Sequence, residues 1–551
     1  MGEEYSSLVV HRQPSCRHAT ADFSISVSRR GDTWAVSTQR EQEQMDAPRS
    51  RVALVAAAKL YLGALRQVLR DPRARDPVGL GPLVVAGHRV ALRPPRLSDA
   101  PLWREIRLRD RQMIESFWVT SPLSWTERHT DVCWVRECLE MRRASRAGRA
   151  LPLVIEIDGQ FAGQCNLERI DMYSRTAEMG IWLDSHASGR GVATAAGALL
   201  LDHAFGALAL KRVTAPIRMD NVATARGAER LGFRHEGTMS GFLDVGGRVK
   251  DHELWAITSK HAPTGGFARA LATQHVVAIP ARGRRVGPAR RERASFRLPR
   301  SKAVLVAVGR YYLRPFRRIH LRHALSRQRG AYSRLRLGPS AVSGAQVVLR
   351  PPRLSDAAAW REIRLRDRAL IEPFWVTSTQ SWAHRHTETI WVRECLLMRR
   401  AARAGHALPL VIEIDGQFAG QCNLERIDAH SCTAEMGIWL DSKVAHRGVG
   451  AAATTLLLEH AFGALRIHRI TAPVGKGNVR AAHLMQRVGM KYEATMVSFL
   501  DVGGQRSDHD LWAVMSEHYA LQPSASPDNR KPRVSTSPGR DLIGGRSEAV
   551  T

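Results

Sequence analysis

The stretch AEMGIWLDSHASGRGVATAAGALLLDHAF, residues 177–205, indicates the fold of this chain in three steps. It begins as a strand, continues through a loop that contains Gly191, and ends in a helix rich in alanine and leucine. This succession is typical of sites that hold phosphate groups. Glycine lets the backbone approach a ligand closely, and the free N–H groups at the start of a helix favour an anion. The alternative interpretation is an ordinary turn between a strand and a helix.

The same succession occurs a second time, as AEMGIWLDSKVAHRGVGAAATTLLLEHAF at 434–462. A constant offset of 257 residues relates 90–261 to 347–518 without insertion or deletion, and about two-thirds of these positions are identical. Solenoid repeats are much shorter than this unit. The chain therefore contains two tandem copies of one complete domain.

The net charge of +30 is distributed unevenly along the 551 residues. Residues 262–346 hold 19 Lys and Arg side chains against one acid, Glu292. Two interpretations remain open for this segment: a solvated linker, or a surface that contacts RNA, ribosomes or an anionic membrane.

Other bulk features exclude several classes of protein. The apolar run at 52–65 is interrupted by Lys59 and is shorter than the roughly 20 residues of a membrane span. The first residues lack the pattern of a secretory signal, and seven cysteines without metal-ligand spacing suit a reducing compartment. We expect a cytoplasmic protein with no membrane span and no metal.

Composition and the repeat divide the chain into six parts. We expect a disordered N-terminal tail at 1–50, a lead-in helix at 51–82, a first domain at 83–262, an Arg-rich linker with a second lead-in helix at 263–339, a second domain at 340–520 and a disordered C-terminal tail at 521–551.

Within the first copy, the residue pattern predicts a mixed α/β order. A tight hairpin turn is expected at Asp158-Gly159, because this dipeptide suits the positive φ angles of such turns. The predicted strands are 90–93, 153–157, 161–169, 176–183 and 212–216, and the predicted helices are 98–110, 127–146, 191–208 and 221–231.

The segments AEMGIWL, RGVA or RGVG, and RVTAPIRMDNVATARGAERLGFRHEG together resemble the RimJ/RimL branch of the GNAT N-acetyltransferase superfamily. The resemblance spans roughly 83–261 and 340–519. It implies two tandem α/β (α+β) domains, each with a central mixed, mainly antiparallel sheet flanked by helices. It also implies acetyl-CoA as acyl donor and an amine as acceptor.

The acetyl-CoA signature of that family, Q/R-x-x-G-x-G/A, is matched by 188–193 and 445–450, although Ser188 and Ala445 depart from its first position. The resemblance also places the residues before the loop beside the pantetheine arm, and an asparagine after the next strand near the cofactor. For both tryptophans a plain core role is the alternative, and for both asparagines a helix N-cap is the alternative. The expected cofactor residues are Trp182, Leu183, Arg190, Gly191, Val192, Ala193, Thr194, Asn221, Trp439, Leu440, Arg447, Gly448, Val449, Gly450, Ala451 and Asn478.

Three catalytic residues are expected. Glu178 and Glu435 are candidates for the base that accepts the amine proton, with pairing to an arginine as the alternative. Thr224 takes the place of the family's serine that is credited with protonating the leaving thiolate, but the second copy has Ala481 there.

Aromatic and histidine residues that occur in both copies are candidates for the walls of an acceptor pocket. The alternative is that they hold the connection between two helices against the core. They are Trp118, Trp125, His129, Trp375, Trp382 and His386, with His252 and His509 similarly ambiguous.

The copies differ most at 211–240, where only 12 of 30 positions match the twin segment. One copy is therefore expected to be specialised or decayed. The expected acceptor is the N-terminal amine of a protein, of the ribosomal-protein alanine type. One alternative is a small amine such as an aminoglycoside or a polyamine. Another is a ribosome- or RNA-binding protein that acts through the basic linker and retains degenerate acetyltransferase folds.

Overall fold

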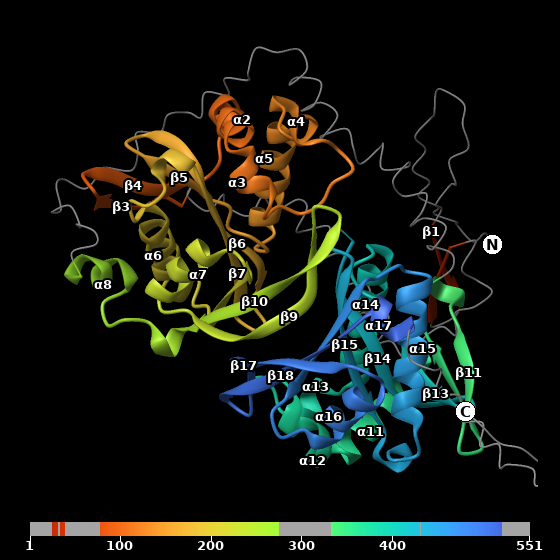
Figure 1. Ribbon diagram of the computed structural model, residues 1–551. Coiled ribbons are helices and arrows are strands. Elements are labelled where there is room, and N and C mark those ends of the chain that lie inside the picture. Colours follow the sequence, from red (N-terminus) through yellow and green to blue (C-terminus); the bar gives the residue numbers. More distant parts are fainter. Residues whose placement is uncertain (1–24, 31–32, 39–77, 275–331, 430, 521–551) are drawn as a thin grey trace, which may run out of the picture.

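The computed structural model describes residues 25–30, 33–38, 78–274, 332–429 and 431–520, and each copy of the repeat forms one sheet with helices on both faces (Figure 1). The strands of the first domain are β3 (Leu80–Val85), β4 (His88–Arg93), β5 (Val154–Ile157), β6 (Gln160–Asp171), β7 (Thr176–Leu183), β8 (Arg212–Arg218), β9 (Arg234–Val245) and β10 (Arg248–Thr258). Its α-helices are α2 (Ala100–Arg109), α3 (Arg111–Glu115), α4 (Trp125–Arg128), α5 (Asp131–Arg146), α6 (Val192–Phe205), α7 (Val222–Arg230) and α8 (Phe267–Thr273).

The second domain repeats this order. Its strands are β11 (Leu337–Val342), β12 (Ala345–Arg350), β13 (Val411–Ile414), β14 (Gln417–Asp428), β15 (Thr433–Leu440), β16 (Arg469–Gly475), β17 (Lys491–Val502) and β18 (Gln505–Met515). Its α-helices are α11 (Ala357–Arg366), α12 (Arg368–Ile371), α13 (Trp382–Arg385), α14 (Glu388–Arg403), α15 (Val449–Gly463), α16 (Val479–Arg487) and α17 (Ser516–Ala520).

The sheet of the first domain has the order β3-β4-β5-β6-β7-β8-β10-β9, and the second domain has the equivalent order. All neighbouring strands within a domain run antiparallel except β7 with β8 and β15 with β16, which are parallel. The structure therefore confirms the mixed, mainly antiparallel sheet expected for each copy.

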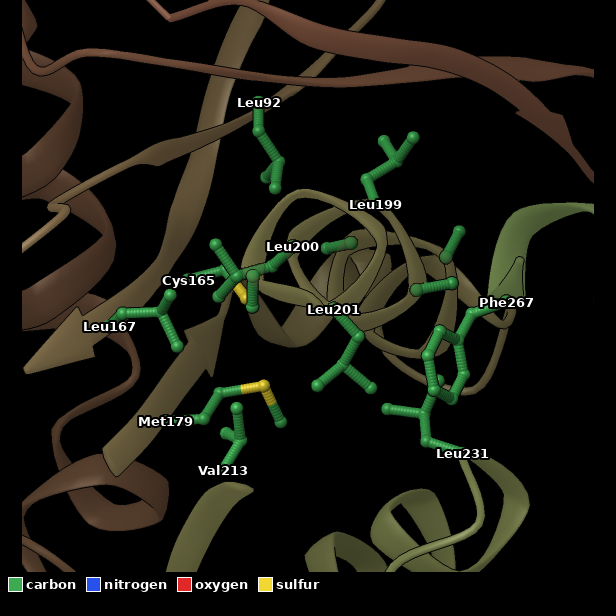
Figure 2. Packing of buried hydrophobic residues seen from close by; sticks show 14 of the residues in the cluster. Leu92, Cys165, Leu167, Met179, Leu199, Leu200, Leu201, Val213, Leu231 and Phe267 are labelled. Carbon is green, nitrogen blue, oxygen red and sulfur yellow. The ribbon is translucent and has the colours of Figure 1, made fainter. Parts of the chain in front are cut away.

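The main core of the first domain lies between the sheet and α6. Nearly every face of α6 is apolar, and Leu200 and Leu201 are fully buried among strand side chains such as Cys165 and Leu167 (Figure 2). Each fully buried leucine stabilises the fold by about 1.5–3 kcal/mol. A helix that is apolar all round must be covered on all sides, which fixes α6 beneath the strands.

A smaller core on the opposite face holds α2 and α5 against the sheet. Trp103 from α2 and Trp134 from α5 are almost fully buried there, with ring centroids 5.1 Å apart. Phe161 from β6 meets Trp134 edge to face at 5.9 Å. The two helices that carry these tryptophans therefore cover the side of the sheet that α6 leaves open.

Several local predictions are confirmed. Asp158 and Gly159 have φ angles of 49° and 87° and connect β5 to β6 as a tight hairpin. The strand predicted at 176–183 is β7 with the same bounds. The helix predicted at 127–146 begins later, at Asp131 in α5, because Thr130 caps it and the short α4 precedes it.

The folded parts extend beyond the predicted domain boundaries. The first domain was expected to begin at 83, but its strand β3 begins at Leu80, and the second was expected to begin at 340, but its strand β11 begins at Leu337. The first domain was expected to end at 262, but α8 packs Phe267 and Leu271 into its core. Inside the tail predicted to be disordered at 1–50, β1 (Ile25–Arg30) and β2 (Thr33–Thr38) pair as an antiparallel hairpin. The lead-in helix predicted at 51–82 is wrong at its end, where 80–82 belong to the strand β3. The rest of that helix, the second lead-in helix, most of the linker and the C-terminal tail lie outside the described residues.

The two domains meet through β9 and β17, a strand pair that the sequence did not indicate. Gly237 pairs with Ala494, which is its own twin at the offset of 257. A Cβ on Gly237 would lie 2.3 Å from the Glu493 carbonyl oxygen, so only glycine permits this approach. The pairing of twin residues gives the domains a pseudo-twofold relation, like the two halves of a symmetric dimer.

Buried ion pairs reinforce the junction reciprocally. The Arg212 guanidinium is fully buried, pairs with Glu236 and donates to the Val497 carbonyl oxygen of the other domain at 2.8 Å. Glu236 in turn accepts the Val497 N–H at 3.1 Å. The twin pair of Arg469 and Glu493 makes the matching contacts with Ser240. Each pair therefore satisfies backbone groups of the opposite domain.

Replacing one member of such a pair should destabilise the whole chain. Glu236→Gln leaves Arg212 buried without its counter-charge, and we expect the free energy of unfolding to fall by about 3–5 kcal/mol in denaturant titrations. Glu115→Gln, which breaks the exposed Arg111–Glu115 pair, is the matched control and should change it by less than about 1 kcal/mol. Equal effects of the two variants would contradict a stabilising role for the buried pair.

Candidate functional site

The parallel strands β7 and β8 separate part of the way along their length. The ladder between them begins where Thr176 pairs with Arg212 and ends where Glu178 pairs with Thr214. β7 nevertheless remains paired with β6 up to Leu183, and β8 remains paired with β10 up to Arg218. Residues 179–183 of β7 and 215–218 of β8 are therefore not paired with each other. We call the gap between these two strand edges the wedge.

The loop after β7 leads into the N-terminus of α6 beside this wedge. Gly191 caps α6 with a φ of 77°, in the left-handed region, and no side chain caps the helix. Gly448 has the same role before α15, with a φ of 81°. The first N–H groups of each helix are therefore available to an anion, and the helix dipole favours one there.

A buried carboxylate fixes this loop in place. Asp110, at the end of α2, accepts hydrogen bonds from the Ser185 backbone N–H at 2.9 Å and from the Ser185 hydroxyl at 2.8 Å. Burial alone would raise the pKa of Asp110, but these bonds and Arg109 outweigh it and lower the pKa to about 2. Asp367 holds Ser442 in the same way in the second domain.

The strand β8 leads into α7 at the other side of the wedge. The Asn221 side chain accepts the Thr224 N–H at 3.2 Å and caps α7, and Asn478 does the same for Ala481 in α16. Both asparagines therefore act as helix N-caps, which was the alternative interpretation of these residues. Thr224 lies in the first turn of α7, at the carboxyl end of β8.

Side chains alternate along β7 and therefore point to the two faces of the sheet in turn. Ala177, Met179 and Leu183 point to the core side of α6. Glu178 and Trp182 therefore face the side covered by α2 and α5, and Trp182 packs against that smaller core. We call this side the helix-pair face.

The Glu178 carboxylate pairs with Arg169 at 3.0 Å, and Arg169 reaches Asp428 of the other domain at 3.3 Å. Burial raises the pKa of Glu178 above its ordinary value, and Arg169 opposes the shift. Glu435 pairs with Arg426 at 2.9 Å, and its pKa is also raised by burial. Pairing with an arginine was the alternative interpretation of both glutamates.

A histidine and two tryptophans lie together on the helix-pair face. His129 is 4% exposed, and its Nδ1–H donates to the Trp125 carbonyl oxygen at 2.6 Å. Its ring lies 4.1 Å from Trp125 and 5.1 Å from Trp103 between centroids. Trp125 and His129 thus pin the connection between α3 and α5 to the core, which was the alternative to an acceptor wall. His386 repeats this arrangement.

The remaining expected residues differ in their burial and contacts. Arg190 and Arg447 are exposed, and Ala193, Gly450 and Ala451 are half-buried in the first turns of their helices. Val192, Val449 and Thr194 have side chains in the cores, so only their backbone groups remain for a ligand. His252 and His509 are buried, and each bonds a nearby backbone carbonyl oxygen through Nδ1. Trp439 and Leu440 match Trp182 and Leu183.

Sequence reasoning did not find Arg107 and its twin Arg364. The Arg107 guanidinium lies between the rings of Trp118 and Trp182, at 3.8 and 4.0 Å from their centroids. A signal was present, since Trp103, Ile106 and Arg107 fall on one helical stripe and are all buried. An arginine on the core-facing stripe of a helix is rare and indicates a special role.

The described residues lack two kinds of feature. No helix there has the length and apolar character that a membrane crossing requires. No group of three or more His, Cys, Asp or Glu side chains is arranged to hold a metal ion in the same part of the chain.

Comparison with known proteins gives a consistent picture. Residues 89–234 and 346–491 each match the family described as acetyltransferase (GNAT) domain. The putative ribosomal N-acetyltransferase YdaF of Bacillus subtilis is 35% identical over 103 residues, which is 19% of this chain and 56% of the relative. Spermidine N(1)-acetyltransferase of Escherichia coli is 30% identical over 112 residues, which is 20% of this chain and 60% of the relative.

Among solved structures, Mycobacterium smegmatis RimJ in complex with CoA-disulfide is 37% identical and aligns with 37% of this chain and 97% of that chain, at a TM-score of 0.36. The chain spans little more than half the length of the two curated relatives above.

The buried histidines should make stability depend on pH. Burial lowers the pKa of His129 and of His386 from 6.5 to about 4. The unfolded chain therefore takes up protons between pH 6.5 and 4 while the folded chain does not, so stability falls as the pH falls through this window. We expect a loss of the order of 3 kcal/mol per histidine below pH 4. Thermal unfolding midpoints at pH 7, 5.5 and 4 measure this loss.

His129→Asn with His386→Asn is the comparison, because asparagine keeps a donor for the carbonyl oxygen without titrating. The unfolding midpoint of this double variant should fall less steeply between pH 7 and 4. The same slope in both proteins would show that these histidines are not the cause.

Proposed function

Because the chain belongs to the GNAT acetyltransferase family, we propose that its domains transfer an acetyl group from acetyl-CoA to a primary amine. The single observation that carries this proposal is the wedge between β7 and β8 beside a helix N-terminus capped by a left-handed glycine. Strand edges without ladder partners suit the amide groups of an extended pantetheine arm. Free N–H groups at a helix N-terminus suit a pyrophosphate.

In the proposed reaction the amine nitrogen attacks the thioester carbonyl carbon. The C–N bond forms, the C–S bond breaks, the amine gives up a proton and the thiolate takes one. We assign Glu178 and Glu435 as proton acceptors, directly or through water, because they lie where each pair of parallel strands begins to separate and face the helix-pair face. Their raised pKa supports this assignment, since a carboxylate with a higher pKa is a better proton acceptor.

The two copies differ at the group proposed to protonate the thiolate. Thr224 provides a hydroxyl in the first turn of α7, whereas Ala481 provides none in α16 and packs against the second core. We therefore infer that the first domain turns over faster than the second. Acetyl-CoA binding does not depend on this position, so both domains bind the donor.

For the acceptor we favour the N-terminal amine of a protein, because one relative is named as a ribosomal N-acetyltransferase. A polyamine is the second candidate, because another relative is named as a spermidine acetyltransferase. Ribosome or RNA contact through the basic linker remains part of the proposal, although that segment lies outside the described residues.

Titration of the intact chain with acetyl-CoA tests the proposal. We expect two binding sites per chain, and one site in Gly191→Trp or in Gly448→Trp. Tryptophan strains a left-handed position and fills the space before the helix, where even a Cβ on Gly448 would lie 3.0 Å from Val342. Gly148→Trp and Gly405→Trp are matched controls at left-handed glycines in open space, and both should keep two sites.

Thiol release with a panel of alanine-starting peptides, aminoglycosides and spermidine then measures turnover in each blocked variant. The Gly448→Trp variant, in which only the first domain binds acetyl-CoA, should release thiol at least about tenfold faster than the Gly191→Trp variant. Adding Thr224→Ala to the Gly448→Trp variant should remove this difference in rate. Absence of acetyl-CoA binding in the unmodified chain would overturn the enzyme proposal. Unchanged stoichiometry in either tryptophan variant would remove that domain from it.

A further inference from the structure

Arg107 and Arg364 are buried cations, and two nitrogen atoms of each lack a hydrogen-bond partner among the described residues. Arg107 is 2% exposed, and its Nε and Nη1 atoms are buried without a hydrogen-bond partner among the described residues. Arg364 is also 2% exposed, and the same two atoms lack partners in the same part of the chain. Buried polar groups normally have partners, so this repeated exception requires an explanation.

Two tryptophans cover the faces of each guanidinium. Trp118 and Trp182 stack on Arg107, and Trp375 and Trp439 stack on Arg364 at 3.9 and 4.0 Å. Such stacking stabilises the positive charge in part. It offers no acceptor to the N–H groups, which point outward in the plane of the guanidinium. Only an acceptor in that plane, such as a carboxylate oxygen, can satisfy these N–H groups.

No side chain of the described residues supplies a counter-charge in contact with Arg107. Glu137 acts on it only from beyond ion-pair distance, and Arg128 adds positive charge nearby. Burial lowers the pKa of Arg107 to about 9, and that of Arg364 equally. A buried cation without a partner costs several kcal/mol, which an apolar residue at the same position would not.

Both copies retain this costly arrangement although they diverge elsewhere. All three members of the stack are identical at the offset of 257, whereas only 12 of 30 positions match in 211–240. Trp182 belongs to the half of β7 that is unpaired with β8, so Arg107 lies on the helix-pair face beside the wedge. The proposed proton acceptor Glu178 faces the same side.

We propose that Arg107 and Arg364 each bind a carboxylate of the acceptor molecule, so that the acceptor of each domain is an amine that also carries an acid. This inference rests on the proposed function, because it identifies the acceptor of the same site. The acceptor class is a peptide or amino compound with an acidic group near its amine. A polyamine, which has only positive charges, is repelled by an uncompensated guanidinium.

Matched acceptors test the proposal in the intact chain. Amidated peptides that begin Ala-Glu or Ala-Ala-Glu are compared with peptides in which glutamine replaces glutamate, and spermidine is included. In the unmodified chain kcat/KM should be at least about tenfold higher for one glutamate peptide than for its glutamine match. In the double variant Arg107→Gln with Arg364→Gln this ratio should fall to about one.

Arg104→Gln with Arg361→Gln is the control, because Arg104 lies on the same helix but pairs with Asp131 at the surface. The control should keep the ratio of the unmodified chain. If the glutamine variants do not fold, Arg107→Lys with Arg364→Lys keeps the charge without the planar edge and should still lower the ratio. Acetyl-CoA stoichiometry shows which variants are folded.

Tryptophan fluorescence gives a readout that does not require turnover, since the binding edge lies between two tryptophans. Titration with the glutamate peptide should change the emission at lower concentration than the glutamine peptide, and only when the arginines are present. If no amine is acetylated but this difference persists, the proposed function fails and the carboxylate site stands. Equal kcat/KM and equal titrations for the paired peptides would overturn the carboxylate site alone.

Discussion

The parting of two parallel strands is the constraint on which the rest of the site depends. β7 and β8 pair only through Glu178 and Thr214, after which each follows its antiparallel neighbour. The wedge exists because the flanking strands continue to hold β7 and β8 along their full lengths. Asp110 then fixes the loop that brings α6 to the mouth of this wedge. In the proposed function, a donor held at α6 and an acceptor on the helix-pair face meet at this gap.

The duplication adds a second constraint. Gly237 faces its own twin, Ala494, and a buried arginine–glutamate pair of each domain bonds backbone groups of the other domain. The chain therefore resembles a symmetric dimer whose two halves have been joined and have then diverged. The shared junction has stayed reciprocal, while the segment around Thr224 and Ala481 has changed. Divergence at this position leaves the fold intact and can change the chemistry of one domain separately.

The sequence was sufficient for features with local causes. Asp158-Gly159 marked a hairpin, and the bounds of β7 followed from its pattern. Features with distant causes were missed: the pairing of β9 with β17 joins residues 257 positions apart, and the stacking of Arg107 on Trp118 and Trp182 forms only when the chain folds. The local motif also indicated the loop and helix of the donor site, but not how β7 and β8 separate.

Hydrogen exchange at the backbone amides of 179–183 and 436–440 tests the central claim most directly. These segments form the β7 and β15 edges of the two wedges, so acetyl-CoA should slow their exchange in both domains. Amides of β9 and β17 around the Gly237–Ala494 pairing, at the junction between the domains, should be unaffected and serve as internal references. Unchanged exchange at 179–183 and 436–440 with saturating acetyl-CoA would contradict the account.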